Sequence, residues 1–220
     1  DVFPGAVELV TKGADGKGVY AYHAAQSVAE DGSFVFKSQA ANLVTPPTTA
    51  GKERFYFFDN TSKTISVLPS FGSERLDWAE ITPDKQWIAL STFDNKLLVN
   101  KVFLYNIGTA DLTTVTKADG APLYVKGLGI TADAAIVAFS SFEKLVAADT
   151  NNLLDVYLWH RDTKAIELAS KKGDGTAAGI ESFGAVSGDG LYVAYIASGS
   201  NFPSCGTQTY IDIFRQNVQT

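Results

Sequence analysis

The sequence predicts an all-β protein built as a β-propeller, and three observations support this fold class. A short apolar strand preceded by an acidic turn recurs four times, at Asp31, Asp84, Asp133 and Asp189. These aspartates lie 53, 49 and 56 residues apart, a period typical of propeller blades. A hairpin follows each of the first three copies at a similar distance, and no long stretch shows helical periodicity.

Each copy predicts its strands in the same order. The Asp-led strand is a continuous apolar run, which is expected when neighbouring blades cover both of its faces. The next two strands are β-branched and aromatic runs around a polar turn. The expected strands are 34–36, 54–59 and 64–68; 87–90, 101–106 and 112–115; 136–139, 155–159 and 165–169; and 191–195 and 210–215. Lys85 and Ala134 replace the glycine after the aspartate, so we expect their turns to use another geometry.

The fourth copy lacks a closing strand, and the N-terminus offers a replacement. Residues 6–12 match residues 165–171 almost position for position. We therefore expect residues 6–12 to complete the fourth blade, which would remove the free edges of an open array. The repeats then span 13–68, 69–115, 116–169 and 170–215 of a single domain, 1–220.

The number of blades stays open at this point. Four blades are the low end of the range for propellers, so the chain is either a complete four-bladed ring or part of a larger propeller. Residues 1–3 resemble residues 155–157 and mildly favour an earlier blade.

Each copy of the repeat has a small residue, then Asp, then Gly or a substitute, and then an apolar strand. This pattern resembles the TolB-like (WD-repeat-like) propeller repeat of bacterial secreted proteins. The third copy is the most similar, at 138–141, 145–146, 149–151 and 155–157, and the resemblance covers roughly residues 6 to 215. It implies a non-catalytic binding or scaffolding propeller in the periplasm or outside the cell, with a protein or glycan partner on one face. Related repeats occur in peptidase propeller domains and surface proteins. A hydrolase, an accessory domain of a larger enzyme and a structural subunit of a surface assembly therefore remain alternatives.

Composition and charge reduce the classes of partner that we expect for this chain. A net charge of −6 with 18 scattered basic residues argues against nucleic acid. No apolar run reaches the length of a membrane helix, so we expect no membrane insertion. The chain contains no methionine and begins at Asp1, which suggests a processed chain or a fragment. Cys205 is the single cysteine and cannot form an internal disulfide, although a bridge between chains, a homo-oligomer or a larger assembly stays open.

Catalytic motifs are sparse, and carboxylates give the best ligand candidates. His23 and His160 are the two histidines, and no nucleophile elbow or phosphate loop is present. Asp149, Asn151 and Asp155 place oxygens at alternate positions, a pattern that could bind calcium, the one candidate cofactor. The alternative is an Asx turn, and the four repeated aspartates are likewise expected to form turns.

The predicted binding residues lie in segments that we expect to cross a propeller face near its central channel. They are Tyr22 and His23 in segment 20–23, Trp78 in segment 75–78 and Phe183 in segment 181–183. Aromatic side chains in such segments can stack on sugars or anchor a protein partner. Trp87, placed equivalent to Phe34, Ile136 and Tyr192, is expected in the core.

Overall fold

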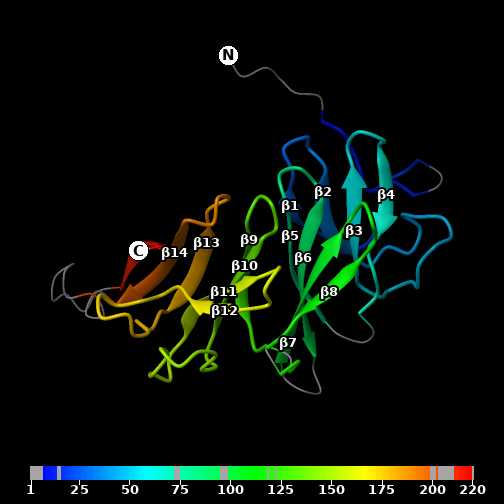
Figure 1. The fold of residues 1–220 in the computed structure, drawn as a ribbon. Coiled ribbons are helices and arrows are strands. Elements are labelled where there is room, and N and C mark those ends of the chain that lie inside the picture. The colour runs from blue at the N-terminus through cyan, green and yellow to red at the C-terminus, as the bar shows by residue number, and fades with distance from the viewer. Residues whose placement is uncertain are drawn as a thin grey trace, which may run out of the picture.

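The protein consists of antiparallel β-sheets arranged side by side (Figure 1). The computed structural model describes residues 7–13, 16–71, 75–94, 99–117, 119–121, 123–198, 202 and 211–219. No α-helix occurs in these ranges, and hence none long and apolar enough to cross a membrane. Cys205 and residues 1–3 lie outside the described residues, so the predictions made for them stay predictions.

The described strands form four sheets, which are the blades of a propeller. Blade 1 contains β1 (His23–Val28), β2 (Phe34–Ser38), β3 (Arg54–Asp59) and β4 (Thr64–Val67). Blade 2 contains β5 (Arg75–Ile81), β6 (Trp87–Asp94), β7 (Val99–Asn106) and β8 (Leu112–Val115). Blade 3 contains β9 (Lys126–Ile130), β10 (Ile136–Ser141), β11 (Asp155–His160) and β12 (Ile166–Leu168). Blade 4 contains β13 (Ser182–Val186), β14 (Tyr192–Ser198) and β15 (Ile211–Asn217). The predicted all-β propeller of antiparallel blades is confirmed.

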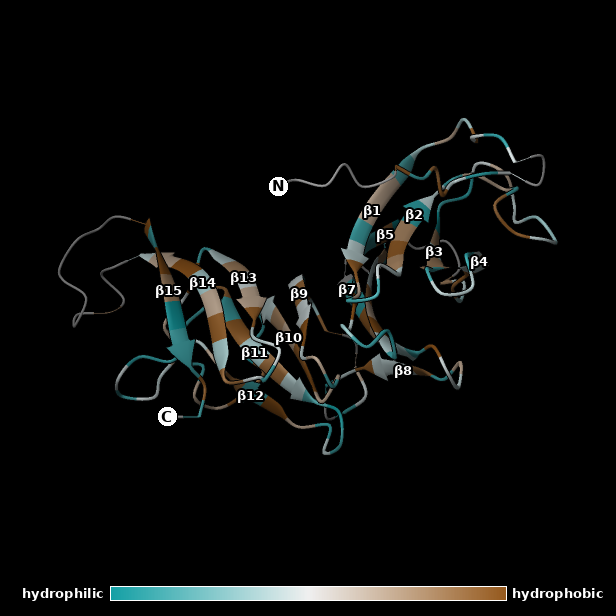
Figure 2. Cartoon of the chain, turned by 90° about the horizontal axis from the view of Figure 1, so that it is seen from above, coloured by the Kyte–Doolittle hydropathy of each residue, from teal (hydrophilic) through white to brown (hydrophobic). Residues whose placement is uncertain are grey.

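The strand closest to the propeller axis in each blade was not anticipated. β1, β5, β9 and β13 precede the Asp turns, and successive members contact one another, so they line the inner side of an arc (Figure 2). Segments 75–78 and 181–183, expected to be linkers, lie mainly within β5 and β13. A bulge interrupts the pairing of each of these four strands. Because a bulge breaks the two-residue alternation of faces, the usual strand pattern is absent from their sequences.

Apolar layers between adjacent blades hold the arc together. Between blades 1 and 2, Val35, Phe55 and Phe57 pack against the layer that contains Ile88 and Leu90. Equivalent layers join blade 2 to blade 3 and blade 3 to blade 4. Each fully buried large apolar side chain contributes about 1.5–3 kcal/mol, so stacking of neighbours stabilises blades that could not hide their faces alone.

The recurring aspartates form turns, as predicted. In each turn the aspartate Oδ1 accepts a hydrogen bond from the backbone N–H two residues later, at 2.8–3.0 Å. The residue between them has a left-handed backbone, with φ of 85° at Gly32, 54° at Lys85, 55° at Ala134 and 73° at Gly190. The expectation of another geometry at Lys85 and Ala134 was therefore wrong. The side-chain hydrogen bond of the preceding aspartate helps to hold a non-glycine residue in this conformation.

The turn of blade 1 is one residue shorter than the other three. Five residues separate the paired Val28 and Phe34, whereas six separate Ile81 and Ile88 in blade 2, with the same spacing in blades 3 and 4. Trp87 is consequently equivalent to Ser33 rather than to Phe34. Its expected place in the core is confirmed, because it packs, partly buried, against the layer between blades 2 and 3.

The N-terminal segment does not complete blade 4. Blade 4 has three strands in the described chain. Residues 7–13 lie instead beside blade 1, where Lys12 bridges Gly18 and Val10 packs near Phe36 and Tyr56. Blade 1 and β15 lie at opposite ends of the arc (Figure 1), so one chain cannot bring these two segments together in this arrangement.

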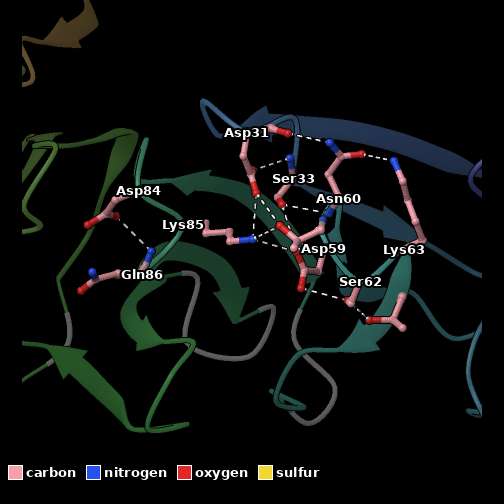
Figure 3. A network of polar contacts seen from close by, with 11 residues as sticks. Asp31, Ser33, Asp59, Asn60, Ser62, Lys63, Asp84, Lys85 and Gln86 are labelled. Atoms are coloured by element: carbon pink, nitrogen blue, oxygen red, sulfur yellow. Dashed lines mark hydrogen bonds and ion pairs between the residues drawn. The ribbon is translucent and has the colours of Figure 1, made fainter. Parts of the chain in front are cut away.

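An ion-pair network links blades 1 and 2 at their turns (Figure 3). The Nζ of Lys85 lies 2.7 Å from Asp31 Oδ2 and 2.8 Å from Asp59 Oδ1. The hydrogen bond from Lys85 lowers the pKa of Asp59 to about 2 and holds the pKa of Asp31 well below its usual range. Asp31 also fixes its own turn through Ser33. The left-handed backbone at Lys85 thus presents a cation to two carboxylates of the preceding blade.

Candidate functional site

A cavity of about 440 Å³ opens on the inner side of the arc, between blades 2, 3 and 4. The innermost strands β5, β9 and β13 supply half of its lining residues, and the rest come from β6, β7, β10 and the loops before β9, β11 and β13. We call it the inner groove and define it by Arg75, Asp77, Trp78, Lys126, Glu181 and Phe183. Two of the predicted binding residues, Trp78 and Phe183, therefore line one cavity.

A bulge in β5 places Trp78 at the groove. The pairing of β5 with β6 shifts between Leu76 and Ala79, which are both buried towards blade 1. Asp77 and Trp78 lie within this irregularity, and Trp78 is 52% exposed. Bulges commonly re-aim a side chain next to a functional site. Trp78 is thus displayed on a rigid strand rather than on a loop.

Glycines allow Phe183 to lie against β9. Gly127 has a φ of +74°, and a Cβ at this position would stand 3.1 Å from Phe183 Cδ1. A Cβ on Gly129 would stand 3.2 Å from Phe183 Cζ. Because a side chain at either position would push the ring away, the two glycines determine where the apolar floor of the groove lies.

Charged side chains surround the aromatic ones. Arg75 Nε donates to Asp77 Oδ1 at 3.1 Å, and the Arg75 guanidinium lies 5.1 Å from the centre of the Phe93 ring. Asn100 Nδ2 donates to the other Asp77 oxygen at 3.4 Å. These contacts orient Arg75 while leaving it largely exposed. Lys126 and the exposed Glu181 add one charge of each sign.

A second cavity of about 690 Å³ adjoins the inner groove and shares Arg75 and Asp77 with it. Tyr22, which is 53% exposed, lines this second cavity. Lys37 crosses from blade 1 and donates from Nζ to the Leu76 carbonyl at 3.1 Å. His23 lines neither cavity; its Nε2 lies 3.2 Å from the Val19 carbonyl oxygen. The structure thus places Tyr22, Trp78 and Phe183 in two cavities that share Arg75 and Asp77, and His23 lines neither of them.

The predicted calcium-binding residues come together, with their oxygens bonded to protein donors. Asp155 is fully buried and accepts from Ser170 Oγ at 2.7 Å, Gly179 N at 2.9 Å and Asn151 Nδ2 at 2.9 Å. Asp149 accepts from Asn151 N at 3.2 Å, which is the Asx turn weighed as the alternative. Burial raises the pKa of Asp155. Calcium binding at these residues stays a prediction.

Sequence reasoning missed Glu80, a half-buried carboxyl on β5. Desolvation raises the pKa of Glu80 to about 7, although the backbone N–H of Ile130 donates to it and opposes that shift. A glutamate between Ala79 and Ile81, in a strand that otherwise buries apolar residues, was the available signal.

His160, the other histidine, pairs with Glu167 at 3.4 Å between the outer strands β11 and β12.

Comparisons with known proteins support the fold alone. No protein-family model matches the chain, and no curated protein matches it. The structure of TolB from Acinetobacter baumannii aligns over 94% of this chain and 45% of its own, with 15% identity and a TM-score of 0.57. The β-propeller domain of the Trilobed protease from Pyrococcus furiosus aligns over 90% of this chain and 54% of its own, with 8% identity and a TM-score of 0.58.

A third similar structure is the acylaminoacyl peptidase from Pyrococcus horikoshii, with 13% identity, a TM-score of 0.53, and coverage of 90% of this chain and 31% of that one. The chain therefore spans about half or less of the length of these three structures. At such low identity the shared feature is the arrangement of blades rather than any activity. The chain has the fold of the TolB-like β-propellers.

Proposed function

We propose that this protein is a non-catalytic binding propeller, whose inner groove takes up a segment of a protein or glycan partner outside the cytoplasm. The observation that carries the proposal is the set of aromatic side chains that line two neighbouring cavities, which share Arg75 and Asp77. Trp78 and Tyr22 are half exposed, and Phe183 lines the same hollow as Trp78. Large aromatic side chains left accessible beside a cavity are typical of binding sites.

The chemistry of the groove suits an extended ligand with both polar and apolar groups. Trp78 and Phe183 offer apolar area at a small cost in side-chain entropy, because each ring has few rotatable bonds. Arg75, held by Asp77, offers a forked donor to a carboxylate or a backbone carbonyl of the ligand. The resemblance of the repeat to that of secreted TolB-like propellers supports a location outside the cytoplasm.

A second function, an accessory propeller of a larger enzyme, is favoured by one specific observation. Two of the similar structures are a protease and a peptidase, and this chain covers 54% of the former's propeller domain and 31% of the latter. In that case the catalytic residues would belong to another part of the polypeptide, and the groove would select substrates rather than cut them.

Binding to arrayed peptides and glycans tests the proposed function, followed by calorimetric titration of any hit. We expect Trp78→Ala and Phe183→Ala each to weaken binding tenfold or more, because interface aromatics dominate binding energy. Leu153→Ala is the matched control, since Leu153 is as exposed as Trp78 but is absent from both cavities. A hit whose affinity both aromatic variants leave unchanged would contradict the proposal. Turnover of peptide or ester substrates by the purified chain would contradict its non-catalytic part.

A further inference from the structure

The last blade exposes an apolar face that the other blades bury. Residue pairing within each sheet identifies Phe55, Val102, Val156 and Ile213 as equivalent positions on the third strands. The first three are 2%, 0% and 0% exposed, because the following blade covers them, whereas Ile213 is 81% exposed. In blades 1 to 3 this position therefore belongs to the interface with the following blade.

Other residues extend this surface across blade 4. Ile211 is exposed on the same face of β15, and Tyr192, Ala194 and Ile196 on β14 are half-buried. The Arg215 guanidinium lies 4.6 Å from the centre of the Tyr192 ring. We call this surface the open face of blade 4 and define it by Tyr192, Ala194, Ile196, Ile211, Ile213 and Arg215. An apolar surface of this kind at a sheet end usually marks an interaction site.

The opposite end of the arc carries the complementary parts. The bridge between Lys12 and Gly18 repeats the bridge between Lys171 and Ala177, which lies between blades 3 and 4. Counting from these bridges, Val10 corresponds to Ala169 and Ala21 to Ile180. Ala169 and Ile180 belong to the layer between blades 3 and 4, while Val10 and Ala21 pack on the outer layer of blade 1. Residues 7–13 and 16–21 are thus placed like the outer strand and crossover of a blade that precedes blade 1.

The edge of blade 4 matches this N-terminal segment in charge and register. In blade 3, Glu167 on the outer strand β12 pairs with Leu158 on β11. The residue of blade 4 that is equivalent to Leu158 is Arg215. The sequence match of residues 7–12 with residues 166–171 puts Glu8 at the position of Glu167. A segment 7–12 added to β15 in this register would therefore place Glu8 opposite Arg215. Opposite charges at directly paired positions stabilise a sheet.

We propose that two copies of this chain close one ring of eight blades, in which residues 7–12 of each copy form the fourth strand of blade 4 of the other. Blade 1 of one copy would then cover the open face of blade 4 of its partner. This contact reproduces the blade 3 to blade 4 interface, so residues 7–13 and 16–21 keep their position beside blade 1. The assembly is two-fold symmetric, leaves no sheet edge at the seams, and has a blade number known for propellers.

The arc shape agrees with half of such a ring. Figure 2 shows the four sheets along a curve that is open on one side. The chain matches 54% of the propeller domain of the Trilobed protease, which is about half of a propeller. Both ends of the arc carry the apolar surfaces described above, and two copies related by a two-fold axis would cover both at once.

Light scattering after size exclusion, with native mass measurement, tests the proposal on the purified chain. We expect a species of twice the chain mass of 23.5 kDa. Ile213→Lys should produce monomers, whereas Leu112→Lys, a change of an exposed apolar residue on the outer strand β8 of blade 2, should not. The proposal would be overturned if the chain stayed monomeric at 100 times the concentration used in the ligand-binding titrations. A dimer that Ile213→Lys leaves intact would overturn it as well.

A charge reversal tests the strand pairing separately. Glu8→Arg and Arg215→Glu should each raise the dissociation constant of the dimer tenfold or more, and the double variant should recover most of that loss. Glu8 also lies 3.7 Å from Lys63 within its own chain, but loss of that contact would not be repaired by a change at Arg215. If the dissociation constant of the double variant's dimer were as high as that of the weaker-binding single variant, the pairing of residues 7–12 with β15 would be overturned.

Discussion

At the scale of single residues, Asp31 both holds the turn of its own blade, through the backbone N–H of Ser33, and binds Lys85 of the next blade. The other repeated aspartates hold the turns of their own blades. Their role in turns was predictable because short polar side chains before an apolar strand favour such bonds. The further role of Asp31, which also binds Lys85 of the next blade, was not predictable, since it depends on how blades 1 and 2 stack. Glu80 was overlooked for a similar reason, because its burial arises from packing between strands.

Replacing Lys85 should weaken the connection between blades 1 and 2. We expect Lys85→Met to lower the melting temperature at pH 7 by about 1–4 °C, the range for a partly exposed ion pair. The paired Asp31 and Asp59 have pKa values lowered in the folded state. Their contribution to the free energy of unfolding is thus present above their unfolded pKa near 3.8, and it is lost as pH falls towards 2. The difference between wild type and variant should therefore shrink below about pH 4.

Thermal melting at pH 3, 4, 5 and 7 measures this effect. Lys63→Met is the matched control, because Lys63 has a similar left-handed backbone and its ion pair with Glu8 is longer, at 3.7 Å. An equal loss at all four pH values would show that packing rather than charge explains the change.

Glu80 should make stability fall as pH rises. Burial raises its folded pKa to about 7, so its contribution is present below the unfolded pKa and is lost as pH rises through 7. We expect Glu80→Gln, which retains an acceptor for Ile130, to stabilise the protein at pH 8 by about 1–3 kcal/mol. Urea unfolding at pH 5 and pH 8 measures this gain, which should be several-fold smaller at pH 5. The exposed Glu181→Gln serves as control; a gain equal to that of Glu80→Gln would point to net charge instead.

At the scale of strands and turns, prediction succeeded where the pattern was regular and failed where the backbone was not. The Asp-led strands and their hairpins read as continuous apolar or aromatic runs and were placed correctly. The innermost strands were missed because bulges and glycines interrupt them, as in Lys126-Gly127-Leu128-Gly129-Ile130. The shorter turn of blade 1 misaligned its copy by one residue, which is enough to exchange the two faces of a strand.

Gly127 links strand geometry to the inner groove. We expect Gly127→Ala to destabilise the protein by about 1–2 kcal/mol, because a side chain at positive φ is strained. The new Cβ would also crowd the ring of Phe183. Gly173→Ala is the control, since its backbone is not left-handed and its Cβ would meet nothing within 4 Å. Denaturant midpoints measure the effect, and equal shifts for both variants would indicate a general cost of losing a glycine.

At the scale of the whole molecule, the location of the site could be predicted better than its composition. Trp78 and Phe183 were selected because aromatic residues before the Asp turns should lie near the axis, and they share a cavity. Arg75 and Lys126 could not be selected with them, because only stacking of blades 2, 3 and 4 brings β5 and β9 beside β13. Closure within one chain was one of the two alternatives that the sequence left open, and the arc keeps its ends apart.

The unequal covering of the blades predicts a gradient of local stability along the chain. Blade 3 is covered on both faces and has all four strands, whereas blade 4 has one open face and three strands. Stability in repeat folds follows contacts with neighbours, so terminal units open first. In the monomeric Ile213→Lys variant, amide hydrogens of β15 should exchange at least a hundredfold faster than those of β10. Exchange measured by mass spectrometry would contradict this gradient if β15 were as protected as β10. In the wild-type chain, β15 should become protected as concentration rises, because the partner would then cover both its edge and its face.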